Sequence, residues 1–346
     1  MVSFKSFVKT LTCCVVLMAA HNAVAQNNEI KEHKAQFKAF YEKEWGQTQP
    51  CKETRLNRYS VCSNVLRNEG NAPFILTNKE SDNVAVLIHG LSDSPFFMRE
   101  IANILFEQGF TVVVPLLPGH GKRDADDDMS DWDLAERWQQ HIDDVINLAN
   151  SMGNTLLVGG FSTGGALAVE HYLDDAENID GIMLFSGALA LSDNAEGMSR
   201  IWGIKLLARM IDGSYETHGP NPYKYPNVAG FAGLELMDLI NTIREKVSEG
   251  QLIEVPLFAA HSQADVTTPI RGIEQLMDAS KGPNTFFVID ESYSLCHADL
   301  VVSPRLLSQM NFNANMVNQQ EECAVPKTNP LFSTMELMLR DYLSQF

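Results

Sequence analysis

The chain has 346 residues, of which 45% are hydrophobic, so it is long enough to bury a full core and its composition does not favour disorder. Its formal net charge of −18 makes nucleic acid and anionic membranes unfavourable partners, because like charges repel. These properties predict one large globular domain, or one domain with an insertion.

The first 25 residues have the features of an export signal. Lys5 and Lys9 precede an apolar run over residues 11–20, and residues 23–25 are small, at the spacing that a signal peptidase accepts. We therefore expect a signal peptide over 1–25 and a processed protein that is periplasmic or secreted. An uncleaved anchor is the alternative, but the run is short for a bilayer, and no other stretch favours stable membrane insertion after cleavage.

Four cysteines follow the expected signal: Cys51, Cys62, Cys296 and Cys323. An even number in an oxidising compartment favours disulfides, for which the sequence permits three pairings. We favour Cys51 with Cys62, which closes a short loop, and Cys296 with Cys323, which ties a long loop to the residue beside His297. Four free buried thiols are the alternative.

The densest acidic run, residues 124–128, begins like a calcium-binding loop. Met129 stands where such a loop needs its turn glycine, and Ala135 stands where it needs its bidentate glutamate. We therefore expect a solvated loop and no metal site.

An N-terminal extension over residues 26–72 comes first in the mature chain. Residues 26–45 mix apolar and charged side chains, which predicts an amphipathic helix packed on the outside of the main fold. From residue 73 on, continuous apolar runs alternate with helical segments, the pattern of an α/β fold with a mostly parallel central sheet and helices on both faces. The expected strands are 84–88, 111–114, 154–159, 181–185, 255–260 and 285–289, and the expected helices include 96–108, 132–151 and 165–172.

The alternation of strands and helices breaks once, between about residues 192 and 250. Helical segments at 201–211 and 231–248 predict an inserted helical cap over 192–250, between two parts of the core, 73–191 and 251–346. The cap either lines an apolar substrate pocket or only packs on the core, and the sequence leaves both readings open.

The most informative stretch is Gly160-Phe161-Ser162-Thr163-Gly164. An apolar, β-branched run precedes it and a helical segment follows it, so the context is strand, turn and helix. A serine in so tight a turn is presented as a nucleophile, and the flanking glycines leave room where a Cβ would collide. The alternative is a glycine-rich connection without chemistry.

A serine hydroxyl is a poor nucleophile near neutral pH, so Ser162 needs a base and an acid that orients the base. His297 follows the last apolar strand, and Asp265 follows the strand before it. The chain order Ser162, Asp265, His297 is typical of this kind of turn. Asp290, which directly ends the last strand, is the main competitor to Asp265.

Three other histidines lie near strand ends or turns. His261 ends a strand and could support the site from behind, whereas His120 lies in a glycine turn and His89 precedes Gly90. None of them follows the final strand, so we expect them to shape loops around the site rather than to act as the base.

Attack on a carbonyl places negative charge on its oxygen, which the site must stabilise with hydrogen-bond donors. We expect an oxyanion hole made by the backbone N–H groups of Thr163, directly after the nucleophile, and of Leu91, in the loop after the strand that ends near His89.

Several segments occur in a specific order between about residues 80 and 300. They are Leu87-Ile88-His89-Gly90-Leu91, Leu117-Pro118-Gly119-His120-Gly121, the serine turn with Gly164-Gly165, Gln263-Ala264-Asp265-Val266-Thr267, and Cys296-His297.

Because of these segments the chain resembles the α/β-hydrolases, in the branch of capped bacterial carboxylesterases and monoacylglycerol lipases. The resemblance implies Ser162, Asp265 and His297 as triad, and Leu91 and Thr163 as oxyanion-hole residues. The N-terminal extension and a long insertion over about 303–330 have no obvious counterpart in that branch.

We therefore expect an exported serine hydrolase that cleaves small carboxylic esters with an apolar acyl group and needs no cofactor. An aminopeptidase, an amidase or a thioesterase on the same triad is the first alternative. A noncatalytic binding protein with this fold is less favoured, because none of the expected catalytic groups is missing.

Overall fold

The computed structural model describes residues 28–346 except 53–56, 80, 202 and 213–214. The predicted signal peptide over 1–25 lies outside the described residues. No helix within the described part of the chain is long and apolar enough to cross a membrane.

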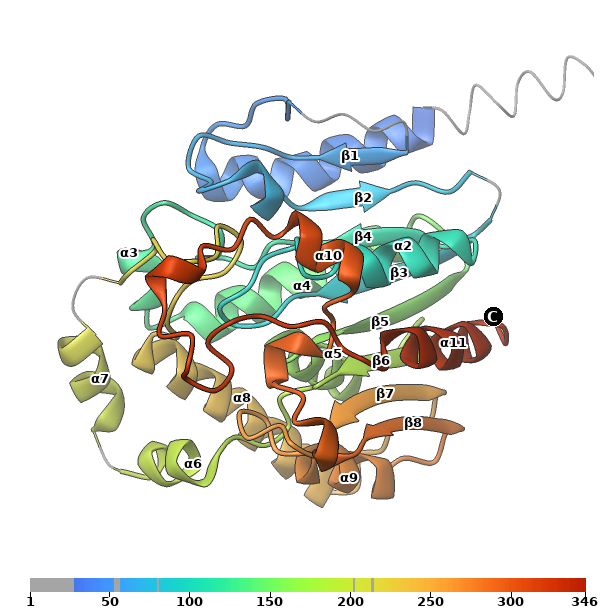
Figure 1. Ribbon diagram of the computed structural model, residues 1–346. Coiled ribbons are helices and arrows are strands. Elements are labelled where there is room, and N and C mark those ends of the chain that lie inside the picture. The colour runs from blue at the N-terminus through green and yellow to red at the C-terminus, as the bar shows by residue number, and fades with distance from the viewer. Residues whose placement is uncertain (1–27, 53–56, 80, 202, 213–214) are drawn as a thin grey trace, which may run out of the picture.

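A mostly parallel sheet runs through the molecule, as the sequence predicts (Figure 1). Within the described residues it has eight strands, in the order β1-β2-β4-β3-β5-β6-β7-β8. β2 is antiparallel to both of its neighbours, β1 and β4, and the other pairings are parallel. The sequence did not predict β1 or β2, each only three residues long. The strands are β1 (Arg58–Ser60), β2 (Phe74–Leu76), β3 (Asn83–Ile88), β4 (Thr111–Val114), β5 (Thr155–Phe161), β6 (Gly181–Phe185), β7 (Leu257–Ser262) and β8 (Asn284–Ile289).

The register of the parallel strands brings distant segments to one edge of the sheet. Ile88 at the end of β3 pairs with Gly160 of β5, and Phe185 at the end of β6 pairs with Phe161. β7 lies beside β6, with Ala260 opposite Phe185. The loops that follow these strands therefore start at the same edge, which is where open parallel sheets place their sites.

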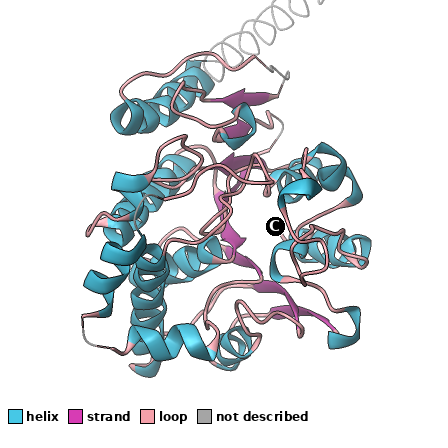
Figure 2. Cartoon of the chain, turned by 60° about the vertical axis from the view of Figure 1, so that its left-hand side comes forward, coloured by secondary structure: helices cyan, strands magenta, loops and turns pink. Residues whose placement is uncertain are grey.

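Helices cover both faces of the sheet, and Figure 2 shows the strands between the two helical layers. The buried side chains form two clusters, one on each face. Trp138 of α4 belongs to one cluster, and Leu339 of α11 belongs to the other. One layer contains α4 (Leu134–Asn150), α5 (Thr163–Asp174), α8 (Gly230–Ser248) and α9 (Arg271–Asp278), and the other contains α2 (Arg99–Glu107), α10 (Pro304–Gln309) and α11 (Phe332–Leu343).

The N-terminal extension is more deeply integrated than the sequence suggests. Its helix spans residues 28–45, close to the predicted 26–45. Phe37 and Tyr41 are buried within the core cluster on the α4 side, and the Tyr41 hydroxyl accepts a hydrogen bond from Leu116 N–H at 3.0 Å. The helix is therefore part of the core, because its aromatic side chains fill space beside β4 that a purely external helix would leave open.

Helices follow β6 and precede β7, where the sequence predicts a cap. α6 (Asp193–Ser199) and α7 (Ile204–Asp212) lie outside the helical layer (Figure 1). α8 contacts α4 and α5 and buries most of its apolar side chains. We therefore propose that the cap ends before α8, and that α8 belongs to the helical layer of the core.

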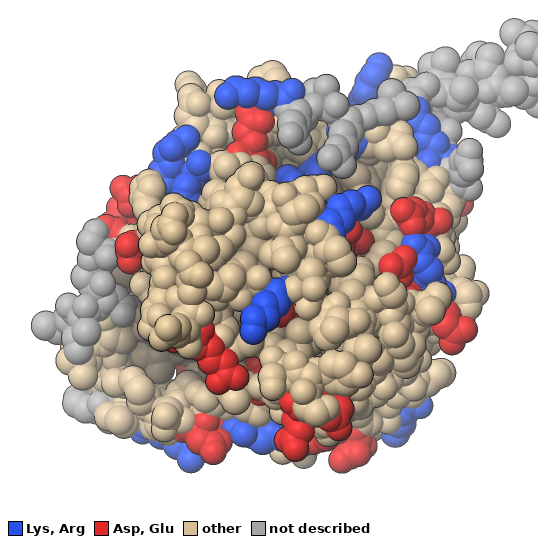
Figure 3. Space-filling model, in the orientation of Figure 1, with Lys and Arg blue, Asp and Glu red and all other residues tan. Residues whose placement is uncertain are grey.

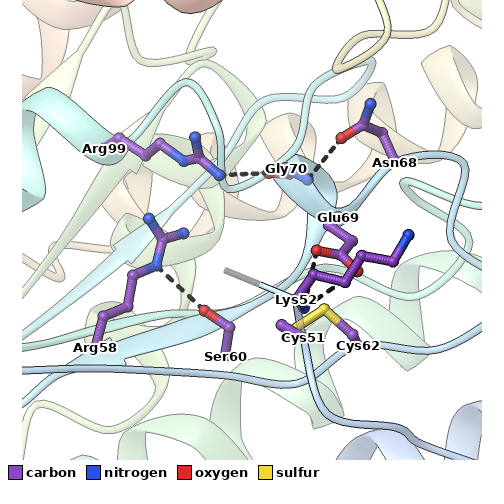
Figure 4. The surroundings of a disulfide bond; sticks show 9 residues. All are labelled: Cys51, Lys52, Arg58, Ser60, Cys62, Asn68, Glu69, Gly70 and Arg99. Atoms are coloured by element: carbon purple, nitrogen blue, oxygen red, sulfur yellow. Dashed lines mark hydrogen bonds between the residues drawn. A yellow bond between two sulfur atoms is a disulfide. The ribbon is translucent and has the colours of Figure 1, made fainter. Parts of the chain in front are cut away.

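The four cysteines after residue 50 pair as predicted. Cys51 and Cys62 are bonded beside the turn η1 (Glu69–Asn71), and the Glu69 carboxylate accepts a hydrogen bond from Lys52 N–H (Figure 4). Cys296 and Cys323 form the second disulfide. This disulfide attaches the loop after α10 to the residue next to His297.

The insertion over residues 303–330 begins with α10 and includes the short helix η4 (Ala314–Met316). Arg305 and Ser303 both hydrogen-bond the Glu100 carboxylate of α2, which holds the start of the insertion against the core. Asn313 N–H donates to Pro220 O at 2.8 Å, so the insertion also reaches the segment after the cap helices.

The acidic run forms part of a short helix, α3 (Asp126–Met129). The Asp128 carboxylate accepts hydrogen bonds from Lys122 and Arg137, so cations of the chain itself neutralise it. On the face drawn in Figure 3, much of the central surface is uncharged and acidic and basic side chains are scattered around it. This face lacks the continuous basic patch that nucleic-acid binding requires.

Candidate active site

Ser162 occupies the turn between β5 and α5, with φ 54° and ψ −118°. A side chain at positive φ is strained, and such strain is common where a residue is held for chemistry. A Cβ on Gly160 would lie 2.4 Å from Ile88 O, and a Cβ on Gly164 would lie 2.2 Å from the same oxygen. Only glycine fits at either position, so the turn lies directly against the end of β3.

The structure brings together the three side chains that the sequence singled out. His297 Nε2 lies 2.9 Å from Ser162 Oγ, and His297 Nδ1 lies 2.6 Å from Asp265 Oδ2. The short helix η3 (His297–Asp299), which follows the second disulfide, carries the imidazole. A hydroxyl, an imidazole and a carboxylate in this arrangement form a continuous proton-transfer relay.

The loop after β7 holds the Asp265 carboxylate from both sides. Oδ1 accepts hydrogen bonds from Thr267 N–H and Thr268 N–H, both at 2.9 Å, and Oδ2 accepts one from Thr268 Oγ1 at 3.0 Å. Burial alone would raise the pKa of Asp265, but His297 and the backbone donors outweigh it and lower the pKa. The carboxylate therefore faces His297 as an anion.

The competing acid and the other histidines take different places. Asp290 is exposed and caps the short helix η2 (Glu291–Tyr293), where it accepts a hydrogen bond from Ser292 N–H. His261 is buried, and its Nε2 donates to Thr268 O at 2.7 Å rather than to Ser162.

The loop after β3 lies against the serine turn. A Cβ on Gly90 would lie 3.0 Å from the ring of Phe161, the residue before Ser162. Among the described residues, neither Leu91 N–H nor Thr163 N–H has a hydrogen-bond acceptor. An oxyanion hole requires backbone donors of this kind that are not already engaged within the protein.

His89 and His120 hold the carbonyl groups of this loop. His89 Nδ1 donates to Gly90 O at 2.8 Å, while its Nε2 accepts from Leu117 N–H, so its tautomer is determined. Burial lowers the pKa of His89 well below its usual value, which keeps the ring neutral. Because C=O and N–H point to opposite sides of a trans peptide, fixing Gly90 O also fixes the direction of Leu91 N–H. His120 Nε2 lies 2.5 Å from Leu91 O, and this contact fixes the orientation of the peptide between Leu91 and Ser92.

Residues 217–225 form a wall beside this loop that no sequence motif revealed. Tyr225 N–H donates to Ser92 O, and Ser94 Oγ donates to Tyr223 O. The Tyr223 ring stacks on Phe96 at 3.8 Å. The N-terminal extension fastens the wall from the other side: the Arg67 guanidinium donates to the backbone oxygens of Thr217, Asn221 and Lys224.

Ser162 is buried, with 7% of its surface exposed. Within the described part of the chain, no group of three or more His, Cys, Asp or Glu side chains is placed to bind a metal ion.

Asp299, two residues after His297, is a buried carboxyl group whose charge opposes folding. Its Oδ1 accepts a hydrogen bond from Lys327 N–H at 3.0 Å, and burial raises its pKa to about 6. Because the folded pKa exceeds the unfolded one, the native state favours the protonated carboxyl, and stability is lost as the pH rises through about 6.

We expect Asp299→Asn, which mimics the protonated group, to raise the free energy of unfolding at pH 7.5 by on the order of 3 kcal/mol. At pH 4.5 the gain should shrink to about 1 kcal/mol. Urea unfolding of both proteins at the two pH values measures this difference. A gain that is equal at both pH values would show that Asp299 is ionised in the native state throughout.

Comparison with known proteins adds independent evidence. Residues 79–225 match the family described as serine aminopeptidase, S33, a match that includes Ser162 but ends before Asp265 and His297. Over 117 residues the chain is 29% identical to the thermostable monoacylglycerol lipase of Bacillus sp. (strain H-257), covering 33% of this chain and 44% of the relative. The chain therefore spans less than half the length of that relative.

Solved structures resemble the chain over most of its length. A structure reported for the metagenome-derived lipolytic enzymes LipS and LipT has a TM-score of 0.53 at 20% identity and covers 68% of this chain and 96% of that chain. The monoacylglycerol lipase of Paleococcus ferrophilus has a TM-score of 0.54 at 16% identity, with 79% and 98% covered. At these identities the likeness shows a shared fold.

Proposed function

We propose that this chain, which has the α/β-hydrolase fold, is an exported serine hydrolase that cleaves carboxylic esters through an acyl-enzyme on Ser162. One observation carries the proposal: Ser162 Oγ, His297 and Asp265 form an unbroken relay with contacts of 2.9 and 2.6 Å. The 29% identical relative is a monoacylglycerol lipase, which favours an ester over other acyl compounds.

Acylation begins when Ser162 Oγ attacks the ester carbonyl carbon and passes its proton to His297 Nε2. Asp265 stabilises the imidazolium and keeps Nδ1 protonated. The carbonyl oxygen becomes an oxyanion that accepts hydrogen bonds from Leu91 N–H and Thr163 N–H. Collapse of this intermediate breaks the bond to the alcohol oxygen, which takes the proton from Nε2.

Deacylation repeats these steps with water as the nucleophile. His297 Nε2 takes a proton from the water as the oxygen attacks the acyl carbon, and it then returns a proton to Ser162 Oγ as the acid leaves. The enzyme ends in its starting protonation state, so the chemistry requires no cofactor.

The substrate we propose is a small ester with an apolar acyl group, in line with the relative that is a monoacylglycerol lipase. The export signal expected over residues 1–25 and the pairs Cys51–Cys62 and Cys296–Cys323 support a periplasmic or secreted location, because such disulfides persist in oxidising compartments.

A serine aminopeptidase is the second candidate, favoured by the name of the matching family. That activity needs a free carboxylate to bind the substrate amine. Asp93, a carboxylate in the loop after β3, does not offer one, because Lys224 Nζ pairs with it at 2.8 Å. This pairing favours the esterase over the aminopeptidase.

A fluorophosphonate probe tests the proposal directly, because it phosphonylates only an activated serine. We expect one adduct per folded chain, located by mass spectrometry on the peptide that contains Ser162, and no adduct after heat denaturation. An unlabelled folded protein would instead indicate a noncatalytic binding protein with this fold. Esters of increasing acyl length, measured beside amino-acid amides and thioesters, then identify the substrate.

A further inference from the structure

Thr268 is a buried residue at the centre of the relay that the proposed mechanism does not use. It lies in the loop between β7 and α9, three residues after Asp265, and is 1% exposed. Its hydroxyl, its amide and its carbonyl each have a partner around the relay.

The Thr268 hydroxyl closes a triangle with Asp265 and His297. Thr268 Oγ1 lies 3.0 Å from Asp265 Oδ2 and 3.1 Å from His297 Nδ1, and these two atoms are 2.6 Å apart. A hydroxyl has one proton to donate. Asp265 Oδ2 is the closer acceptor for it, since the other acceptor, Ser186 O, lies at 3.3 Å.

Hydrogen bonds of its backbone hold Thr268 in this position. Its N–H donates to Asp265 Oδ1 at 2.9 Å, and its carbonyl oxygen accepts from the buried His261 Nε2 at 2.7 Å. A threonine side chain is restricted at χ1, so a fixed backbone leaves the hydroxyl few positions.

We propose that Thr268 is a positioning residue that acts through Asp265, a role that rests on the proposed function of the relay. Two amides hold Oδ1, and rotation of the planar carboxylate about its last torsion, which is soft, would move both oxygens together. The Thr268 hydroxyl donates to Oδ2 and thereby keeps that oxygen in line with His297 Nδ1.

The test compares Thr268→Val, which keeps the shape and loses the hydroxyl, with Thr268→Ser, which keeps the hydroxyl. Thr242→Val is the matched control, because among the described residues the hydroxyl that it removes bonds only Asp238 O, within α8. The readouts are the rate constant for fluorophosphonate labelling and the kcat and KM for an ester.

We expect Thr268→Val to lower kcat and the labelling rate about 10-fold with KM unchanged, as for the loss of one hydrogen bond to a charged group. Thr268→Ser should stay within about 3-fold of the wild type, since a shorter side chain keeps the same donor. Thr242→Val should label at the wild-type rate. Equal losses in Thr268→Val and Thr268→Ser would overturn the proposal, because they would trace the effect to packing.

A second comparison separates action through Asp265 from a direct effect on His297. In an Asp265→Ala background, labelled at high probe concentration, Thr268→Val should cause no further loss. The same 10-fold loss in that background would overturn the proposal. If the folded wild type does not label at all, the proposed function fails, and this role fails with it; if the wild type labels and Thr268→Val matches it, only this role fails.

Discussion

Ser162→Ala should lower kcat for ester hydrolysis by about six orders of magnitude, because members of such a relay act as a unit. The substitution removes the atom that forms the acyl-enzyme and leaves His297 with no hydroxyl to deprotonate. The remaining rate comes from the backbone donors and from binding alone. End-point assays at high enzyme concentration can measure so large a decrease, provided that the protein is free of contaminating esterases.

The double variant Ser162→Ala/His297→Ala provides the control for this first prediction. If the two side chains act in one relay, the double variant should be no slower than either single variant. Independent losses that multiply would mean that His297 serves some step that does not involve Ser162, which contradicts the relay.

Asp265→Asn should lower kcat by about four orders of magnitude through the wrong tautomer of His297. Oδ1 accepts two backbone N–H groups, so an asparagine must place its carbonyl oxygen there. Its NH₂ group then occupies the position of Oδ2, 2.6 Å from His297 Nδ1. Nδ1 becomes the acceptor, the ring proton moves to Nε2, and that nitrogen can no longer take the proton of Ser162.

Asp290→Asn is the matched control for this second prediction, because Asp290 is exposed and bonded to Ser292. It should hydrolyse esters at the wild-type rate. A wild-type rate in Asp265→Asn together with a large loss in Asp290→Asn would assign the orienting role to Asp290.

The sequence predicted the parts of this molecule that repeat a local pattern. The strands from β3 to β8 are continuous apolar runs, so their positions followed from composition, and the order Ser162, Asp265, His297 followed from the strand ends. Both disulfide pairs were predicted correctly, one as the closure of a short loop and the other as the attachment of a long loop beside His297.

The parts that remained unpredicted depend on contacts between distant segments. β1 has only three residues and pairs with β2, and β2 is in turn held in the sheet by its pairing with β4. No sequence motif marks Arg67 or residues 217–225. Arg67 holds this segment through hydrogen bonds that form only when the N-terminal extension packs against it in the folded chain. Thr268 lies three residues after Asp265, and nothing in its sequence position distinguishes it from Thr267.

The attachment of the wall has a consequence for engineering this scaffold. The Tyr223 ring lies between Phe96 and Gly70, where any Cβ would come within 2.1 Å of the ring, and Asn311 Nδ2 donates to its hydroxyl at 3.3 Å. A cap that is grafted together with its junction from a homologue without the N-terminal extension would lack these contacts. A chimera should therefore exchange α6 and α7 alone and keep the native junction from Thr217 to Tyr225.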